Sequence, residues 1–215
     1  MNTDTPLPPE EPAGENPPDG AMIDYYLNSN STSPVKLEIL NAKGDIIRTY
    51  TSKDTLYTIP ELNIPLYWIR PQQILAATAG AHRFLWDMKY EPLNVPAAYP
   101  MTAIIHNTAP HATAPWVMPG TYKIRLTANG QSQEQTITIT MDPRVKTSST
   151  ELQRQHDLSV ICYEGRKKSM NKFPAINQKF TGLFNILEST EMAPTSQTEK
   201  AVKETQLELE NLLKK

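Results

Sequence analysis

The sequence predicts a mainly β protein, in which an antiparallel β-sandwich of immunoglobulin-like or fibronectin III-like type is followed by two or three helices. Three observations lead to this fold class. Apolar and polar residues alternate in short runs between residues 20 and 142, no helical pattern separates these runs, and a helical period begins after Pro143. The single cysteine rules out the Cys…Trp…Cys spacing of true immunoglobulin domains, so the expected sandwich is Ig-like.

These patterns divide the chain into a linker at residues 1–19, a sandwich at residues 20–142 and a helical appendage at residues 143–215. The linker holds six prolines and five acidic residues, without lysine or arginine. This composition predicts an extended, solvated segment, and it lacks the basic and apolar regions of a secretory signal. We therefore expect the chain to begin at a domain boundary of a longer protein; an ordinary frayed terminus is the alternative.

Two hairpins are expected in the sandwich. In the first, residues 35–39 and 46–50 alternate in polarity around a turn that contains glycine. In the second, two alternating runs flank Asn129-Gly130, a pair that suits the positive φ angles of a type I′ turn. Further strand-like runs cover residues 21–27, 66–69 and 82–90. One side of the last run carries His82, Phe84, Trp86, Met88 and Tyr90.

The helical appendage begins with a clear start signal. Capping boxes at Ser148-Ser-Thr-Glu151 and Ser196-Gln-Thr-Glu199 predict the first residues of the first and last helices. Between them lies a helix with Pro174 in its first turn and an apolar stripe along one face. The stripe consists of Phe173, Ile176, Phe180, Leu183, Phe184 and Leu187.

Residues 91–119 interrupt the strand pattern with six prolines. A stretch of this length without its own periodicity is uncommon in a compact domain and often has a function. We therefore expect a contact surface for a partner here, with Tyr99, Trp116, Val117 and Met118 as the candidate residues. Trp116 has two interpretations, an anchor folded onto the sandwich or an exposed contact.

The sequence contains none of the common catalytic or nucleotide-binding motifs. His106 and His111 lie five residues apart, but no Cys, Asp or Glu nearby completes a metal-binding shell. Cys162 is expected to be buried and unreactive, and His82 and His156 to be packed imidazoles. The prediction is therefore no catalytic residue, no metal and no cofactor.

A glycoside hydrolase would need two facing carboxylates. The candidates considered in the β region are Asp19, Asp24, Asp45, Asp54, Glu61, Asp87, Glu91 and Asp142. Asp87 follows Trp86 in an expected strand, but no spacing pairs any two of these acids. A sugar-binding surface is a different possibility, because the flat rings of Trp68, Trp86 and Trp116 suit the apolar face of a pyranose; packing in the core is the alternative for each ring.

Composition excludes other partners. The chain has 215 residues and a net charge of −2, with a pI near 6.1 and a mean hydropathy of −0.48. It therefore offers no basic surface for nucleic acid and no apolar run long enough to span a membrane. A single cysteine forms no internal disulfide, so the cysteine content does not indicate the cellular compartment of the protein.

Five segments of the β region carry a family resemblance: residues 14–26, Asn63-Ile-Pro-Leu-Tyr-Trp-Ile-Arg-Pro71, Gly80–Tyr90, Pro119–Leu126 and Met141–Thr147. They resemble the C-terminal region of bacterial sortilin-like (VPS10-type) and BNR-repeat β-propeller proteins, many of which are labelled glycosyl hydrolases. The similarity continues more weakly through Ala193-Pro-Thr195 and the last helix.

In such proteins this region follows the propeller repeats, where any enzymatic or ligand-binding role is expected. The Asp-box repeats of the propeller (S-x-D-x-G-x-x-W) are missing from this sequence. The resemblance therefore implies an accessory Ig-like domain in an exported protein of the periplasm or cell surface, with no catalytic residue to transfer.

Three functional hypotheses follow. The first is a non-catalytic accessory domain that packs on or positions a β-propeller in cis, or in trans if the chain is free-standing. The alternative is a carbohydrate-binding module that uses exposed aromatic residues. A small glycoside hydrolase is the least favoured hypothesis.

Overall fold

The structure is a computed structural model, and it describes residues 20–56, 58, 59, 61, 69, 72–94 and 114–214. Several predictions concern residues outside these ranges, namely the linker at 1–19, Trp68, Tyr99, His106 and His111. The described residues form two compact units. The first contains the described residues of 20–87 together with 123–136, and the second contains 88–94, 114–122 and 137–214. Parts of the predicted proline-rich loop therefore belong to the same unit as the helices.

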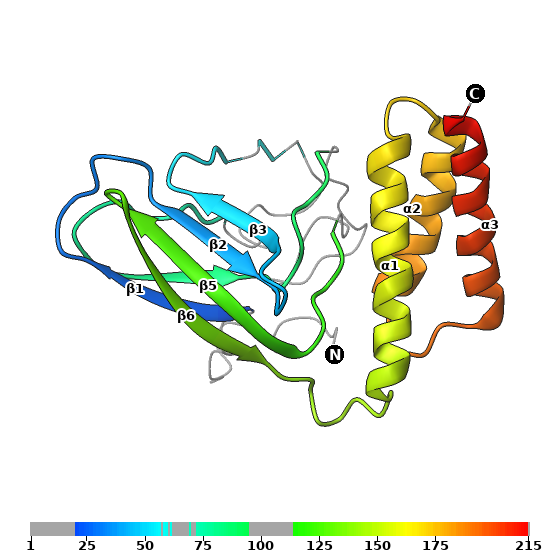
Figure 1. Cartoon of the computed structure of the whole chain (residues 1–215), viewed down its shortest axis with the longest axis horizontal. Coiled ribbons are helices and arrows are strands. Elements are labelled where there is room, and N and C mark those ends of the chain that lie inside the picture. Colours follow the sequence, from blue (N-terminus) through cyan, green and yellow to red (C-terminus); the bar gives the residue numbers. More distant parts are fainter. Residues whose placement is uncertain are drawn as a thin grey trace. The chain divides into compact units, whose positions relative to one another are not determined.

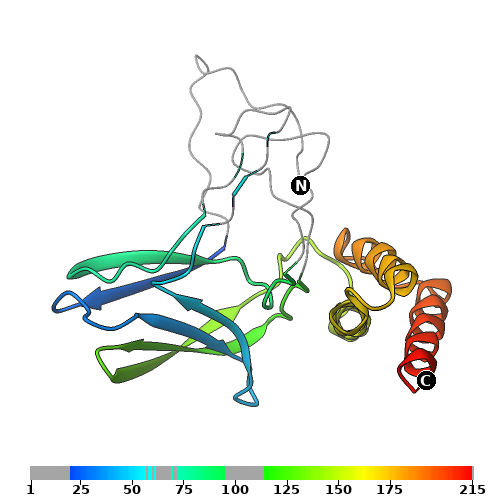
Figure 2. The same cartoon turned by 90° about the horizontal axis from the view of Figure 1, so that it is seen from above.

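Six strands form two antiparallel sheets in the described part of the chain (Figure 1). A two-stranded sheet pairs β1 (Ala21–Leu27) with β4 (Gly80–Trp86). A four-stranded sheet has the order β3-β2-β5-β6 and consists of β2 (Lys36–Leu40), β3 (Ile46–Thr51), β5 (Gly120–Ala128) and β6 (Gln131–Ile139). Figure 2 shows β1 and β4 in one layer and β2 and β3 in another.

The turn predicted at Asn129-Gly130 is confirmed. Both residues have positive φ angles, 50° for Asn129 and 77° for Gly130, as a type I′ turn requires. The Asn129 side-chain oxygen also accepts hydrogen bonds from the Ser31 hydroxyl at 3.0 Å and the Thr32 N–H at 2.9 Å. One asparagine therefore closes the β5–β6 hairpin and holds the loop between β1 and β2 beside it.

The core of the first unit contains apolar side chains from both sheets. Tyr50 on β3 and Phe84 on β4 meet edge to face, with ring centroids 4.6 Å apart. Leu37, Ile39 and Trp86 are completely buried, with exposed fractions of 0%. Burial of this apolar surface is the main favourable contribution to folding of the unit.

The predicted run from His82 to Tyr90 is wrong beyond Trp86. Strand β4 ends at Trp86, and Met88 has a φ of 58°, which no extended strand contains. Tyr90 consequently lies in the second unit and not on the aromatic face of β4.

Three helices complete the second unit: α1 (Ser149–Ser169), α2 (Pro174–Glu188) and α3 (Ser196–Leu213) (Figure 1). The capping box predicted for α1 is confirmed, since the Ser148 hydroxyl accepts the Glu151 N–H and the Glu151 carboxylate accepts the Ser148 N–H. Pro174 occupies the first turn of α2 as predicted. The buried part of the α2 stripe consists of Ile176, Phe180, Phe184 and Leu187.

The start of α3 differs from the prediction by one residue. Thr195, not Ser196, is the N-cap, and its hydroxyl accepts the Thr198 N–H at 3.1 Å. Glu199 does not reach back to the cap; its carboxylate forms an ion pair with Arg154 on α1. The ion pair between two helices thus replaces the expected local capping box.

The fold class is confirmed at the level of antiparallel sheets followed by helices. The helices hold 21, 15 and 18 residues, so the described chain is a mixed β and α protein and not a mainly β one. Among the described residues, no helix combines the length and apolar character that a membrane span needs.

Candidate functional site

Two short segments of the second unit, residues 88–94 and 114–119, form what we call the loop base. Lys89 and Trp116 form an antiparallel bridge. The Tyr90 N–H donates to the Pro115 carbonyl at 3.0 Å, and the Val117 N–H donates to the Met88 carbonyl at 2.9 Å. The loop base therefore brings together the start and the end of the predicted proline-rich loop.

Three polar contacts fix the loop base to α1 and α2. The Trp116 N–H donates to a carboxylate oxygen of Glu188 at 3.0 Å. The Tyr163 hydroxyl donates to the carbonyl of Glu91 at 2.8 Å. The Tyr90 hydroxyl lies 3.4 Å from Nε2 of His156. Because these contacts come from different turns of two helices, they define the position of the loop base within its unit.

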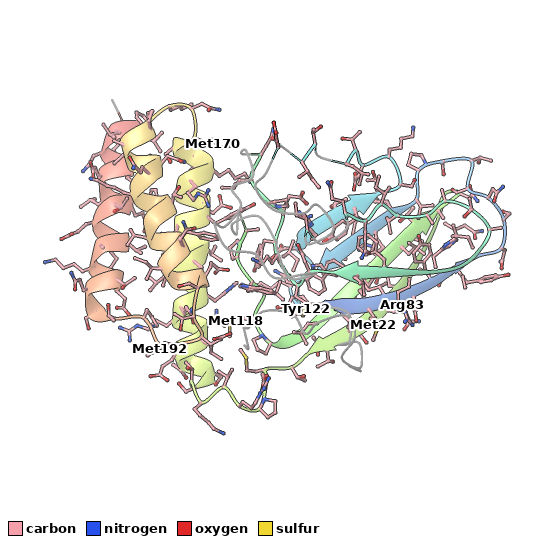
Figure 3. All side chains as sticks on the ribbon, turned by 180° about the vertical axis from the view of Figure 1, so that it is seen from behind. Met22, Arg83, Met118, Tyr122, Met170 and Met192 are labelled. Carbon is pink, nitrogen blue, oxygen red and sulfur yellow. The ribbon has the colours of Figure 1, made fainter. Side chains whose placement is uncertain are left out.

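Trp116 reaches solvent from this fixed backbone. Its side chain is 45% exposed, and the Lys89 ammonium lies 4.3 Å from the centroid of its ring. Both interpretations of Trp116, an exposed contact and an anchor folded onto the sandwich, stay predictions. Val117, the next residue, is only 8% exposed and points inward. Met118 is half-buried, and its carbonyl accepts the Tyr122 hydroxyl at 2.6 Å (Figure 3).

Burial controls the titration of the groups beneath Trp116. Burial raises the pKa of the Glu188 carboxyl, while the Ser159 hydroxyl, the Trp116 N–H and the Lys89 ammonium oppose this increase. Burial also lowers the pKa of His156, against the opposing effects of Asp157 and the Trp116 backbone. The carboxyl of Glu188 acts here as an acceptor for backbone, so it holds the loop base in place.

Cys162 and Arg166 lie on the buried side of α1. Cys162 is completely buried, and this burial raises the pKa of its thiol to about 12, as expected for an unreactive cysteine. Arg166 is 6% exposed, and its guanidinium lies 5.3 Å from the centroid of the Phe184 ring. Within the described part of the chain, its Nε and Nη1 atoms have no hydrogen-bond acceptor.

Three of the carboxylates considered for a hydrolase have other partners. Asp24 forms a two-pronged ion pair with Arg83, at 2.7 and 2.8 Å. Asp142 binds Arg144, which lowers the pKa of Asp142 to about 2. Asp87 lies 3.4 Å from the Tyr50 hydroxyl. The described residues 20–94 and 114–214, apart from the gaps given above, contain no cluster of three or more metal-ligating side chains.

The aromatic and histidine predictions have mixed outcomes. Trp86 is 0% exposed, so the interpretation of this ring as part of a sugar platform is wrong. His82 and His156 each lie against a tyrosine ring, Tyr25 and Tyr90 respectively, as packed imidazoles do. Sequence patterns gave no sign that Glu188 would support Trp116, because these residues are far apart in the chain and meet only in the folded unit.

Comparisons with known proteins found no match for this chain. No protein-family model matches the chain, and neither a curated protein nor a solved structure is significantly similar to it. The resemblance to the C-terminal region of sortilin-like and BNR-repeat proteins therefore stays a prediction.

Proposed function

We propose that this chain is a non-catalytic accessory domain of an exported bacterial protein, and that it packs on and positions a sortilin-like or glycosidase-like β-propeller. Its two sheets then form an Ig-like sandwich, and the loop base of the second unit carries the contact surface. The observation that supports this proposal best is Trp116, an exposed aromatic side chain whose backbone is fixed on both sides.

A tryptophan whose backbone is already fixed favours binding to a partner for an energetic reason. Tryptophan is enriched among the residues that dominate binding energy, and a side chain that is ordered before binding loses less entropy when the complex forms. Glu188 holds the Trp116 backbone from below, and Lys89 covers one part of its ring. The remaining exposed ring surface is available to an apolar pocket of the partner.

The arrangement of polar groups near Trp116 also supports a contact role over catalysis. Glu188 accepts a backbone N–H, His156 packs against Tyr90, and the thiol of Cys162 is buried. Glu188 and His156 hold the loop base in position, which is the expected use of partly buried polar side chains in a rigid binding surface.

Photo-crosslinking in the source cells tests the proposal. The photoreactive residue p-benzoylphenylalanine replaces Trp116 in the native protein, and cross-linked peptides are identified by mass spectrometry. The same residue at Met192, which is 72% exposed between α2 and α3, is the matched control. We expect position 116 to cross-link to a β-propeller segment, and an immunoblot to show whether that segment belongs to the same polypeptide.

Two results would contradict the proposal. Cross-links at position 116 that are no more frequent than at position 192 would remove Trp116 as a contact. A dominant cross-link to a protein without a propeller would keep the contact but reject the partner.

A further inference from the structure

The outer face of the two-stranded sheet carries a second group of exposed side chains. Residues of β1 alternate, so Ile23 and Leu27 are buried while Met22, Asp24 and Tyr26 point to solvent. In the register of the sheet, these three outward residues lie opposite Leu85, Arg83 and Ala81 on β4. We call these six residues the outer face; Figure 3 shows Met22 and Arg83 on this sheet.

A shallow depression of about 510 Å³ lies on this sheet, lined by Asp24, Tyr25, Tyr26, Ala81, His82 and Arg83. Its form follows from the pairing. Ala81 lies opposite Tyr26 in the register, and both residues line the depression together with Arg83. The Tyr26 side chain is 68% exposed, so its ring is accessible beside that space.

The polar side of the depression offers an acceptor and a donor next to each other. Arg83 uses Nε and Nη2 for its two hydrogen bonds to the Asp24 oxygens. Its Nη1 has no acceptor among the described residues, and each carboxylate oxygen keeps a lone pair. Two vicinal hydroxyl groups match this pair, because one hydroxyl donates to the carboxylate while its neighbour accepts from the guanidinium.

Charge restricts the class of ligand. The Asp24 carboxylate repels an anion and the Arg83 guanidinium repels a cation, so the pair as a whole complements an uncharged, hydroxyl-rich molecule. An exposed ring beside such a pair combines an apolar surface for one face of a sugar ring with oriented hydrogen-bonding groups for its hydroxyls.

We propose that the outer face of β1 and β4 is a binding subsite for a neutral sugar. One pyranose ring stacks on Tyr26, and its vicinal hydroxyl groups bind Asp24 and Arg83. This subsite differs from the tryptophan platform considered above, because Trp86 is buried and Trp116 carries the Lys89 cation on its ring. It is also independent of Trp116 and the proposed propeller contact.

The test begins with the full chain, labelled at its N-terminus, on an array of neutral and acidic glycans. The best neutral glycan is then titrated into the chain by calorimetry. We expect Tyr26→Ala to weaken binding by about tenfold or more, and Tyr26→Phe, which keeps the ring, to stay within about twofold of the parent. Asp24→Asn and Arg83→Ala each remove one partner of a hydroxyl group and are expected to weaken binding by about three- to tenfold.

Two variants serve as controls. Met192→Ala changes an exposed apolar residue in the helical unit and should leave sugar affinity unchanged. Trp116→Ala should also leave it unchanged. Binding that survives Tyr26→Ala, binding that is lost with Trp116→Ala, selection of acidic glycans alone, or no binding to any glycan of the array would each overturn the proposal.

Discussion

The loop base and the outer face both place a carboxylate next to an aromatic ring, but in opposite surroundings. At the loop base, Glu188 of α2 is partly buried, this burial raises its pKa, and its carboxylate accepts the backbone N–H of Trp116. On the outer face, Asp24 is in solvent, and the hydrogen bonds from Arg83 lower its pKa. The first carboxylate is used to build the structure, whereas the second keeps its charge and its free lone pairs for a ligand.

This difference predicts unequal costs for losing an aromatic ring. Phe184 is completely buried beneath Arg166, so Phe184→Ala should lower the free energy of unfolding by about 3–5 kcal/mol. Tyr26→Ala, on the outer face, should change it by about 0.5 kcal/mol or less. Urea denaturation of both variants measures the contrast. Equal losses would show that the outer face is part of a packed interior.

A pair of glycines gives the next largest effect and tests the packing of the helices. A Cβ at Gly165 would lie 2.5 Å from the Phe180 ring, so Gly165→Ala should cost about 1–3 kcal/mol through overpacking. Gly182 in α2 has open space around it, so Gly182→Ala should stabilise the helix by about 0.5–1 kcal/mol. Thermal unfolding of the two variants should therefore shift in opposite directions; a shared direction would contradict the crossing at Gly165.

The partly buried carboxyl of Glu188 predicts a specific pH dependence. Because the folded state raises the pKa of Glu188, this group favours folding most below its unfolded value of about 4.5, and the contribution is lost as the pH rises through the folded pKa. Glu188→Gln keeps an acceptor for Trp116 and removes the charge. The variant should match the parent at low pH and exceed its stability at neutral pH.

Denaturation curves between pH 4 and pH 8 check this expectation. Lys89, Ser159 and Cys162, which face the carboxyl, are unchanged in the variant, so a constant difference between the two proteins across this range would contradict the assignment to Glu188.

The smallest effect is expected for the ion pair of the outer face. Asp24 and Arg83 are both exposed, and exposed ion pairs contribute little to stability. Arg83→Ala should therefore leave the unfolding midpoint unchanged within error while it weakens sugar binding. A clear loss of stability would assign the pair a structural role and weaken the argument for a ligand.

Local sequence signals predicted the local structure well. Asn129-Gly130 and the box from Ser148 to Glu151 each act through hydrogen bonds and φ angles within a few residues, so their outcome depends little on the rest of the fold. Thr195 shows the limit of this approach. Its cap is displaced by one residue from the predicted one, and Glu199 binds Arg154 on another helix, a contact that no local pattern contains.

The candidate sites were harder to predict for the same reason. The sequence marks Trp116 as a candidate contact residue, but its support by Glu188 joins residues 72 positions apart. Met88 has a positive φ angle, and this angle ends the predicted aromatic run. The sequence gives no sign of it, because positive φ angles are expected at glycine and not at methionine. Tyr26 and Arg83 face the same depression only because β1 and β4 pair in one register.

The contrast between Trp86 and Trp116 gives the protein a built-in optical signal. The indole of Trp86 lies in an apolar interior at 0% exposure, so it should emit at shorter wavelength and resist dissolved quenchers. The indole of Trp116 meets water beside a positive charge, so iodide should quench it more strongly than caesium does. In a Trp68→Phe variant, which removes the third tryptophan, a partner that covers Trp116 would abolish this preference, and occupancy of the loop base can therefore be followed by fluorescence without any added label.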